Sequence, residues 1–436
     1  MPKKKTALTI EERLQQALVP AEEQPYEVPE NWVWVRLTNI ISLSTGKKDA
    51  NYGSDKGVYP FFTCASEPIA CNDYSFDGES ILVPGNGANV GLVIYYNGKF
   101  EAYQRTYVIQ KSKFNIKFIY YNMLAFWDEH NRNKQYGSAT NYIKLGNFES
   151  YNIALPPLSE QQRIVERIEE LFAKLDEAKE RLQEVADSFA VRKAAILHKA
   201  FTGELTKQWR CENGVSDESW EEKTIGEICS SLKYGTSKKS SDDGEVVVLR
   251  MGNLQNGEID WSNLAYTSDE EDIKKYLLKS GDVLFNRTNS PELVGKTSIY
   301  RGEMPAIYAG YLIKLDYEKN IVVGDYLNYY LNSSKAKEYY MQVKTDGVSQ
   351  SNINAKKIGE FEIPLPTITE QHEIVRLIDD LLARERAAQQ ATEQALASID
   401  LMKKSILARA FRGELGTNKA SEASALELLK QVLAEN

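Results

Sequence analysis

The 436-residue sequence contains few of the side chains on which metal centres and disulfide frameworks depend. It has four cysteines and three histidines, and no two cysteines form a Cys-x-x-Cys pair. Structural zinc sites and disulfide-rich folds both require closely spaced sets of these residues. The sequence therefore predicts no metal site and no disulfide bonds.

Long hydrophobic runs are also missing. No apolar run approaches the roughly 20 residues needed to cross a bilayer, and the MPKKK start continues into polar and acidic residues where a secretory signal would be apolar. We therefore expect a cytoplasmic protein with no membrane contact. Hydrophobic residues make up 42% and charged residues 26% of the chain, as in soluble folded proteins. Its length predicts two or three domains.

Complete catalytic motifs are missing as well. The stretch GNGANVG at 85–91 follows an apolar run, as in a phosphate-binding loop, but a hairpin-like segment follows where a helix is required. The stretch SPELVGKTS at 290–298 ends like a P-loop, yet Ser290 stands where the first glycine is needed. We expect no catalytic residues in this chain. An enzyme that uses the glycine loop as its site is a third-ranked alternative.

Positive charge is not in excess. The net charge is −9; residues 31–152 carry 12 basic and 10 acidic side chains, and residues 217–362 carry 18 and 24. This balance excludes a uniformly basic surface for nucleic acid. Any DNA contact must use local patches, and a more basic partner would neutralise much of the phosphate charge.

What the sequence does contain is a long internal repeat. IALPPLSEQQRIVERI at 153–168 recurs 210 residues later as IPLPTITEQHEIVRLI at 363–378, and KAAILHKAFTGEL at 193–205 recurs as KKSILARAFRGEL. Each copy predicts one long helix, with Ser159 or Thr369 as candidate N-cap and Gly203 or Gly413 as the stop. A helix from about 160 to 202 is roughly 60 Å long.

Each predicted helix carries a hydrophobic seam typical of a coiled coil. The second seam is weaker, because Glu385 and Thr392 are poor seam residues if left unpaired. The predicted seam residues are Ile164, Ile168, Leu171, Leu175, Leu182, Val185, Phe189, Ile374, Ile378, Leu381 and Ile399.

A globular segment precedes each helix, and the two segments are loosely related, with Trp32 aligned to Trp220. Short apolar runs, Asn-Gly turns and a tyrosine-rich helical stretch in each predict mixed α/β structure. The predicted class is α+β, with two such domains joined by two long antiparallel helices in a pseudo-twofold repeat. The expected boundaries are 1–30 for an N-terminal segment with a short helix, 31–155 for the first domain, 156–216 for the first helix and a linker, 217–365 for the second domain, 366–415 for the second helix, and 416–436 for a tail helix.

The paired LPPLSEQ and LPTITEQ starts, the AFTGEL and AFRGEL ends and the Trp32 and Trp220 openings closely resemble the specificity subunit of type I restriction-modification enzymes, over nearly the whole chain. The resemblance implies that each domain is a target recognition domain reading one half of a split, asymmetric site in double-stranded DNA, and that the helices set the spacer. It implies two methyltransferase subunits and restriction subunits with translocase activity as partners. S-adenosylmethionine, ATP and Mg²⁺ would then bind to those partners, and this chain would need no cofactor of its own.

Base readout requires Arg, Asn or Gln on loops that reach the major groove, whereas lysines favour phosphate contacts. The candidates in the first domain are Lys47, Lys48, Asn86, Asn89, Gln104, Arg105, Lys134, Gln135, Ser138, Asn141 and Lys144. The candidates in the second domain are Tyr234, Lys238, Lys239, Arg250, Asn286, Arg287, Thr288, Asn289, Lys296, Gln350, Ser351 and Asn352. The main rival interpretation is a duplicated binding or scaffold protein on a coiled-coil stalk with no DNA role.

The two ends of the chain also resemble each other. TIEERLQQALVPAEE near the N-terminus and SALELLKQVLAEN at the C-terminus both predict amphipathic helices, with Leu14 and Leu18 matching Leu429 and Leu433. We expect both helices to flank the helix pair symmetrically and to engage the methyltransferase partners. The simpler alternative is a frayed terminal helix.

Overall fold

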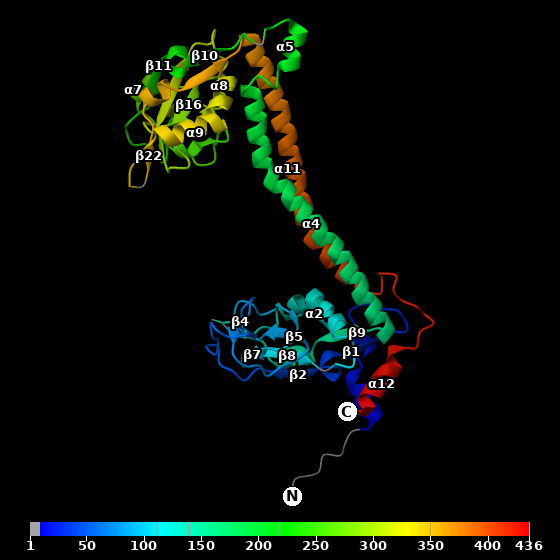
Figure 1. Cartoon of the computed structure of the whole chain (residues 1–436). Helices are drawn as coiled ribbons and strands as arrows, with labels where there is room; N and C mark the ends of the chain where they lie inside the picture. The colour runs from blue at the N-terminus through cyan, green and yellow to red at the C-terminus, as the bar shows by residue number, and fades with distance from the viewer. Residues whose placement is uncertain (1–8, 111, 138–139, 217, 349, 436) are drawn as a thin grey trace. The chain divides into compact units, whose positions relative to one another are not determined.

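The computed structural model describes residues 9–110, 112–137, 140–216, 218–348 and 350–435. The chain divides into two compact units, one formed by residues 1–182 and 395–436 and the other by residues 183–394 (Figure 1). Each unit therefore contains one globular domain together with part of each long helix.

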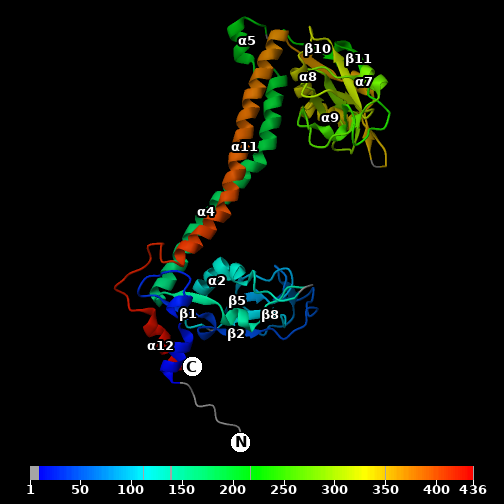
Figure 2. The same cartoon turned by 180° about the vertical axis from the view of Figure 1, so that it is seen from behind.

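The two long helices are α4 (Leu158–Phe201) and α11 (Ile368–Ala410), of 44 and 43 residues. Within each unit, their segments lie side by side in both views (Figure 1, Figure 2). Both begin one residue before the predicted N-cap. Thr367 fills that role in α11, since its hydroxyl accepts a hydrogen bond from the Glu370 amide. Both helices stop as predicted, because Gly203 and Gly413 adopt left-handed φ values of 76° and 75°.

The segments of α4 and α11 are antiparallel within each unit. In the first unit Lys403 pairs with Asp176 at 2.5 Å, and Asp400 lies 3.9 Å from Lys179. The second unit contains the pair between Arg192 and the predicted seam residue Glu385, at 2.8 Å. Thr392 is buried and donates its hydroxyl to the Ala388 carbonyl at 2.8 Å. Both polar seam residues therefore have partners.

Most of the predicted seam is buried or half-buried. Ile164, Ile168, Ile374, Ile378, Phe189 and Ile399 are buried, and Leu171, Leu175, Leu182 and Leu381 are half-buried. Val185 corrects the prediction, because its side chain is 40% exposed, whereas the neighbouring Ala186 is half-buried. A straight helix has 3.6 residues per turn and drifts against a strict heptad, which moves the buried stripe by one position.

The first domain is built on a four-stranded sheet and a three-stranded sheet. In the first sheet the order is β2 (Ser42–Thr45), β8 (Thr106–Gln110), β5 (Glu79–Pro84) and β6 (Ile94–Asn97). In the second sheet the order is β4 (Ile69–Cys71), β3 (Tyr59–Phe62) and β7 (Glu101–Ala102). The domain is completed by β1 (Val33–Arg36) paired with β9 (Asn152–Leu155), by α2 (Ile116–Asn131) and by α3 (Leu145–Glu149).

The second domain repeats this topology strand for strand. Its four-stranded sheet has the order β11 (Cys229–Tyr234), β20 (Leu312–Tyr317), β16 (Val283–Asn286) and β18 (Thr297–Ile299). Its first three-stranded sheet has the order β15 (Tyr266–Thr267), β12 (Val246–Leu249) and β19 (Ala306–Tyr308). The pair β12 and β19 is parallel, like β3 and β7, and the neighbouring pairs are antiparallel in both domains. The predicted α+β class with a duplicated domain is confirmed.

Several smaller elements complete the second unit. The strand β10 (Glu221–Thr224) pairs with β23 (Glu362–Leu365), as β1 does with β9. A hairpin of β21 (Thr345–Asp346) and β22 (Ser351–Asn352) joins β17 (Thr288–Asn289) in a small sheet, and β13 (Leu254–Gln255) pairs with β14 (Glu258–Ile259). The helices are α5 (Lys207–Asn213), α6 (Ile225–Ile228), α7 (Glu270–Tyr276), α8 (Gly324–Leu331), α9 (Ser334–Val343) and α10 (Ala355–Gly359).

One close backbone approach is shared by the two domains. A Cβ atom on Gly46 would lie 1.8 Å from the Ala102 carbonyl oxygen, and a Cβ atom on Gly235 would lie 2.1 Å from the Tyr308 carbonyl oxygen. Each glycine directly follows the first strand of the four-stranded sheet and packs against the backbone of the last strand of the three-stranded sheet. Glycine is required because no other residue leaves room for the facing backbone.

The helices α1 (Ile10–Ala17) and α12 (Ala425–Glu435) pack against each other in the first unit. Arg13 donates a hydrogen bond to the Leu433 carbonyl at 3.1 Å, and Leu429 is fully buried in the core of the first domain. The predicted symmetric flanking of the helix pair is therefore wrong. Both amphipathic faces are covered by the same core, so α12 is not a frayed end either.

In the described part of the chain, none of the helices combines the length and hydropathy needed to span a bilayer. Within the same residues, no group of three or more His, Cys, Asp or Glu side chains is arranged to hold a metal ion. Cys64, Cys71, Cys211 and Cys229 are free thiols.

Candidate nucleic-acid interface

The first domain is attached to the long helices through a buried carboxylate at the start of α4. Glu160 is fully buried and accepts hydrogen bonds from the Trp32 indole at 2.9 Å, the Asn418 amide at 2.8 Å and the Thr417 hydroxyl at 3.2 Å. Thr417 and Asn418 follow the end of α11. One carboxylate therefore joins the opening of the domain, the start of one helix and the segment after the other, and neutral donors stabilise its charge.

The second domain uses the same arrangement with a different donor set. Glu370, at the start of α11, is fully buried and accepts hydrogen bonds from the Trp220 indole at 3.1 Å and the Thr206 hydroxyl at 2.7 Å. The Arg210 guanidinium lies 2.8 Å away and is itself only 8% exposed. Thr206 and Arg210 follow the end of α4, so this attachment contains a buried ion pair.

The glutamine after each of these glutamates fixes the start of a domain helix. Gln161 donates to the Pro156 carbonyl at 3.0 Å and accepts from the amide of Asn115, the N-cap of α2, at 2.9 Å. Gln371 likewise accepts at 2.8 Å from the amide of Val323, the N-cap of α8. The repeated Glu-Gln pair is therefore an attachment motif. The sequence displayed its recurrence but gave no sign of its burial.

The repeated phenylalanine near the end of each helix contacts the domain that does not precede that helix. Phe411 packs against Phe118 of α2, with ring centroids 5.2 Å apart. Phe201 packs against Tyr326 and Tyr330 of α8, at 5.3 and 5.0 Å. Each domain is thus fixed by the start of its own helix and by the end of the other helix.

Loops that carry candidate residues of the first domain meet at one end of its four-stranded sheet. The Gln104 backbone amide donates to the Lys48 backbone carbonyl at 2.9 Å, and the Gly85 backbone amide donates to the Arg105 backbone carbonyl at 2.8 Å. The Asn141 carbonyl accepts from the loop after β5 at 2.8 Å. Residues spread over about a hundred positions are therefore brought into one cluster of loops, as a recognition surface requires.

The candidates in these loops differ in how free their side chains are. Lys47, Gln104, Arg105, Lys134, Asn141 and Lys144 are exposed, and Lys48, Asn86, Asn89 and Gln135 are half-buried. The Asn89 amide donates to the Cys64 carbonyl at 2.8 Å, and the Lys144 ammonium lies 4.2 Å from the Tyr136 ring centre. Ser138 lies outside the described residues. The exposed polar and cationic side chains are suited to phosphate and base contacts.

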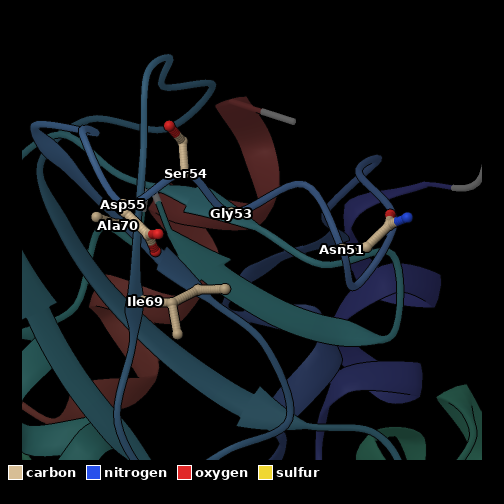
Figure 3. Close-up of a pocket in the computed structure, with 6 residues that line it drawn as sticks. All are labelled: Asn51, Gly53, Ser54, Asp55, Ile69 and Ala70. Atoms are coloured by element: carbon tan, nitrogen blue, oxygen red, sulfur yellow. The ribbon is translucent and has the colours of Figure 1, made fainter.

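The first domain also has an open hollow of about 490 Å³ beside these loops. It is formed by the loop after β2 and by β4, and Figure 3 shows its lining side chains. The lining residues are Asn51, Gly53, Ser54, Asp55, Ile69 and Ala70. The lining has a carboxylate and no cation, so this hollow is not suited to a phosphate group.

In the second domain Arg287 lies at the end of β16 on an aromatic support. Its guanidinium carbon lies 4.8 Å from the ring centre of Tyr234, and its Nη1 donates to the Gly310 carbonyl at 3.3 Å. The Tyr234 hydroxyl accepts from the Ala355 amide at 2.9 Å. Stacking and hydrogen bonding restrict the guanidinium, which favours planar recognition of a base edge.

Three further candidates line one polar hollow of about 420 Å³. They are Arg250, Asn289 and Lys296, and the Lys296 ammonium donates to the Gln255 side chain at 2.8 Å. Arg250 donates to the Asn263 side chain at 3.1 Å. The remaining exposed or half-buried candidates are Lys239, Thr288, Gln350 and Asn352.

Two candidates in the second domain are weakened by their burial. Asn286 is fully buried and its side-chain oxygen accepts from the Thr288 amide at 3.3 Å. Ser351 is fully buried and donates its hydroxyl to the Asp346 carboxylate. Asn286 lies in β16, which pairs with β20, and Ser351 lies in β22, which pairs with β17. Burial and internal hydrogen bonds make both side chains weaker candidates for base contacts.

Lys238 has its charge neutralised inside the domain. Its ammonium lies 2.7 Å from the Asp269 carboxylate, 3.6 Å from Asp272 and 3.8 Å from Glu271. The hydrogen bond to Asp269 raises the pKa of Lys238. A phosphate group would have to compete with three carboxylates for this cation, so Lys238 is a weaker candidate than Lys239.

Sequence comparisons relate most of the chain to one protein family. The family model described as type I restriction modification DNA specificity domain matches residues 29–187 and 217–396. The EcoDI specificity subunit of the type I restriction enzyme from Escherichia coli is 30% identical over 447 residues, covering 94% of this chain and 96% of the relative. The EcoKI specificity subunit from Escherichia coli strain K12 is 30% identical over 313 residues, covering 69% of this chain and 67% of the relative.

Structural comparisons agree on the fold. The HsdS subunit from Thermoanaerobacter tengcongensis matches with a TM-score of 0.62 and 19% identity, over 90% of this chain and 100% of that chain. A chain from a study of complex assembly and conformational transition of the type I restriction-modification system matches with a TM-score of 0.66 and 18% identity, with the same coverage. At these identities the similarity establishes the fold alone.

Proposed function

Because the chain belongs to the family of type I restriction-modification DNA specificity subunits, we propose that its two domains read the two halves of an interrupted site in double-stranded DNA. The observation that carries the proposal is that two domains matched by one DNA specificity model share one sheet topology while their loops differ. After β5 the first domain has Asn86-Gly87-Ala88-Asn89, and after β16 the second has Arg287-Thr288-Asn289-Ser290. One scaffold with two loop sets is suited to an asymmetric site.

Long-read methylation sequencing of the host with and without this gene tests the proposal. We expect one interrupted adenine-methylated motif to disappear when the gene is deleted and to return when it is restored. Retention of every methylated motif after deletion would contradict the proposal.

Arg287 is the side chain we expect to contribute most to base readout in the second domain. Replacement with Ala should weaken binding by about 1 to 3 kcal/mol and relax the preference at one base pair, because a bidentate contact is lost. Arg301→Ala, which breaks a pair with Glu258 at 2.7 Å, is the matched control in the same domain. An unchanged motif and unchanged occupancy after Arg287→Ala would remove this residue from the readout.

The helices α4 and α11 are proposed to set the unspecified gap between the half-sites. One helical turn added to both helices should lengthen the gap, since four residues add roughly 6 Å of helix. The insertions belong near Ala178 in α4 and near Asp400 in α11, because Lys179 and Asp400 lie at the same level of the pair. An active complex that keeps its original spacing would refute the ruler role.

The chain is further proposed to dock two methyltransferase subunits and, through them, restriction subunits with translocase activity. Two equivalent positions of the repeat support this, since Val191 of α4 is 70% exposed and Leu401 of α11 is 66% exposed. Either Val191→Asp or Leu401→Asp should reduce the methyltransferase copies retained in a pull-down from two to one. Two retained copies with both substitutions present would exclude these positions.

We propose that the partner subunits catalyse the reactions. S-adenosylmethionine would bind to the methyltransferase subunits, and ATP with Mg²⁺ to the restriction subunits, so this chain would contribute recognition without catalysis. A partner-free preparation should therefore bind no S-adenosylmethionine by calorimetry, and saturable binding would contradict this division of roles.

A further inference from the structure

The hairpin of β21 and β22 presents an apolar side chain at its tip. Figure 1 shows this hairpin, labelled β22, projecting from the body of the second domain. Val348 is fully exposed, and Gln350 is exposed two positions later. Single exposed aliphatic residues are common on protein surfaces. The position of this one is informative because of what anchors the hairpin.

The hairpin is joined directly to the strand that carries candidate base readers. Its strand β22 pairs with β17, with Thr288 opposite Asn352 and Asn289 opposite Ser351. The Asn352 amide donates to the Thr288 hydroxyl at 2.8 Å. The residue after β22 donates its backbone amide to the Arg287 carbonyl at 2.9 Å. The hairpin that carries the tip is therefore hydrogen-bonded to the Arg287–Asn289 segment.

Charged groups at the base of the hairpin are used within the hairpin itself. The Lys344 ammonium pairs with the Asp346 carboxylate, which also accepts from the Ser351 hydroxyl. The Lys357 ammonium donates to the Val343 carbonyl, and to the Thr345 hydroxyl at 3.0 Å. Among the tip residues that the structure describes, Val348 offers an aliphatic side chain and Gln350 a neutral amide for contacts. These groups suit the edges of bases better than phosphate oxygens.

Both groups have a counterpart on one base pair. The major groove admits a two-stranded β-ribbon, and an A·T pair displays there the thymine C5-methyl group together with adenine N6 and N7. We propose that Val348 and Gln350 read one A·T pair in the half-site bound by the second domain. Val348 packs on the thymine methyl group. The side-chain oxygen of Gln350 accepts a hydrogen bond from adenine N6, and its side-chain nitrogen donates one to adenine N7. This inference rests on the proposed function.

The test uses the full chain assembled with its methyltransferase subunits and duplexes of its own methylated sequence. The relevant half-site is the one whose base preference changes with Arg287→Ala. Each thymine in it is replaced in turn by deoxyuridine, which lacks only the C5-methyl group. We expect one replacement to weaken binding about fourfold, the effect of one buried methyl-sized group.

Two variants assign that effect to the hairpin. Val348→Ser should bind the thymine and deoxyuridine duplexes equally. Gln350→Ala should weaken binding on the order of tenfold and relax the preference at the same base pair. Val58→Ser is the matched control, because Val58 is a 79% exposed valine in the first domain. It should keep the fourfold response.

The possible failures are distinguishable. If the half-site contains no A·T pair, if no thymine responds to deoxyuridine, or if Val348→Ser keeps the full response, the inference is wrong while half-site reading stands. If neither half-site is bound with sequence preference, the proposed function itself fails.

Discussion

The two domain attachments place the same carboxylate in two different electrostatic settings. In the first unit the buried Glu160 is stabilised by an indole, an amide and a hydroxyl, all neutral. In the second unit the buried Glu370 has an indole and a hydroxyl, together with the guanidinium of Arg210. The two attachments share the acceptor, the indole and a hydroxyl, and they differ in the remaining donor, which is an amide in the first unit and a guanidinium in the second.

This difference shows that the attachment depends on satisfying a buried acceptor and does not depend on one particular donor. A buried carboxylate is costly unless it is hydrogen-bonded, and either a cation or several neutral donors can meet that need. Removing a donor should nevertheless destabilise the two attachments to different extents. Removing the partner of a buried ion pair leaves an uncompensated charge, whereas removing one of several neutral donors leaves the others in place.

The largest effect is expected from Arg210→Ala. We expect the free energy of unfolding of the second unit to fall by about 3 to 5 kcal/mol, because the buried Glu370 carboxylate loses its cationic partner. Chemical denaturation combined with hydrogen exchange on peptides from each unit measures this. Arg384→Ala, which breaks an exposed pair with Asp380, is the control in the same unit and should cost less than about 0.5 kcal/mol. Adding Glu370→Gln to Arg210→Ala should restore part of the loss; no recovery would argue against the buried-charge explanation.

Gly46→Ala and Gly235→Ala test the close backbone approach that the two domains share, so both substitutions should have similar effects on stability. Each new Cβ would lie about 2 Å from a facing carbonyl oxygen, so each substitution should destabilise its own domain by about 1 to 3 kcal/mol or more. Gly252→Ala is the control, since a Cβ there meets no atom within 4 Å. Thermal unfolding monitored separately for each domain checks the match. A large loss in one domain alone would show that the shared topology hides a different backbone constraint.

Asn418→Ala addresses the neutral attachment. Glu160 keeps the Trp32 and Thr417 donors, so the first unit should lose about 1 to 3 kcal/mol, less than Arg210→Ala costs the second. The exposed Asn133 in the same unit provides a control substitution to Ala. Denaturation and hydrogen exchange again give the values. Equal losses from Asn418→Ala and Arg210→Ala would remove the distinction between the two attachments.

The smallest effect concerns pH. Arg163 donates to the Glu422 carboxylate at 2.9 and 2.8 Å, and this bonding lowers the pKa of Glu422 below its ordinary value of 4.5. The pair therefore stabilises the first unit above pH 4.5, and the contribution is lost as the pH falls through the lower folded pKa. We expect Glu422→Gln to flatten this part of the stability profile between pH 6 and 3. An unchanged profile would show that Glu422 is not linked to folding.

Sequence patterns predicted elements that depend on local chemistry. The stops at Gly203 and Gly413 followed from the need for a left-handed residue, and both are present. The correspondence of Trp32 and Trp220 followed from the repeat. Val185 was misassigned because a heptad template ignores the drift of a straight helix. The burial of Asn286 and Ser351 was not predicted, because it depends on strand pairings between distant segments.

The terminal helices illustrate the same limit of local patterns. Their matching leucines correctly indicated two amphipathic helices, but symmetry in sequence suggested symmetric placement. The structure instead pairs α1 with α12 in the first unit. An apolar stripe determines that a helix must bury one face, and it does not determine which surface covers that face.

By itself, the sequence determined that one topology is used twice and that one long helix follows each copy in the chain, because repeated motifs, glycines and hydrophobic periods act through local sterics and burial. Only the tertiary structure decided that Glu160 and Glu370 are the buried acceptors, that the segment after each helix supplies donors to them, and that Val348 stands exposed beside the Arg287 segment. Those features depend on contacts between residues far apart in the chain. Local chemistry does not encode such contacts until the backbone brings the residues together.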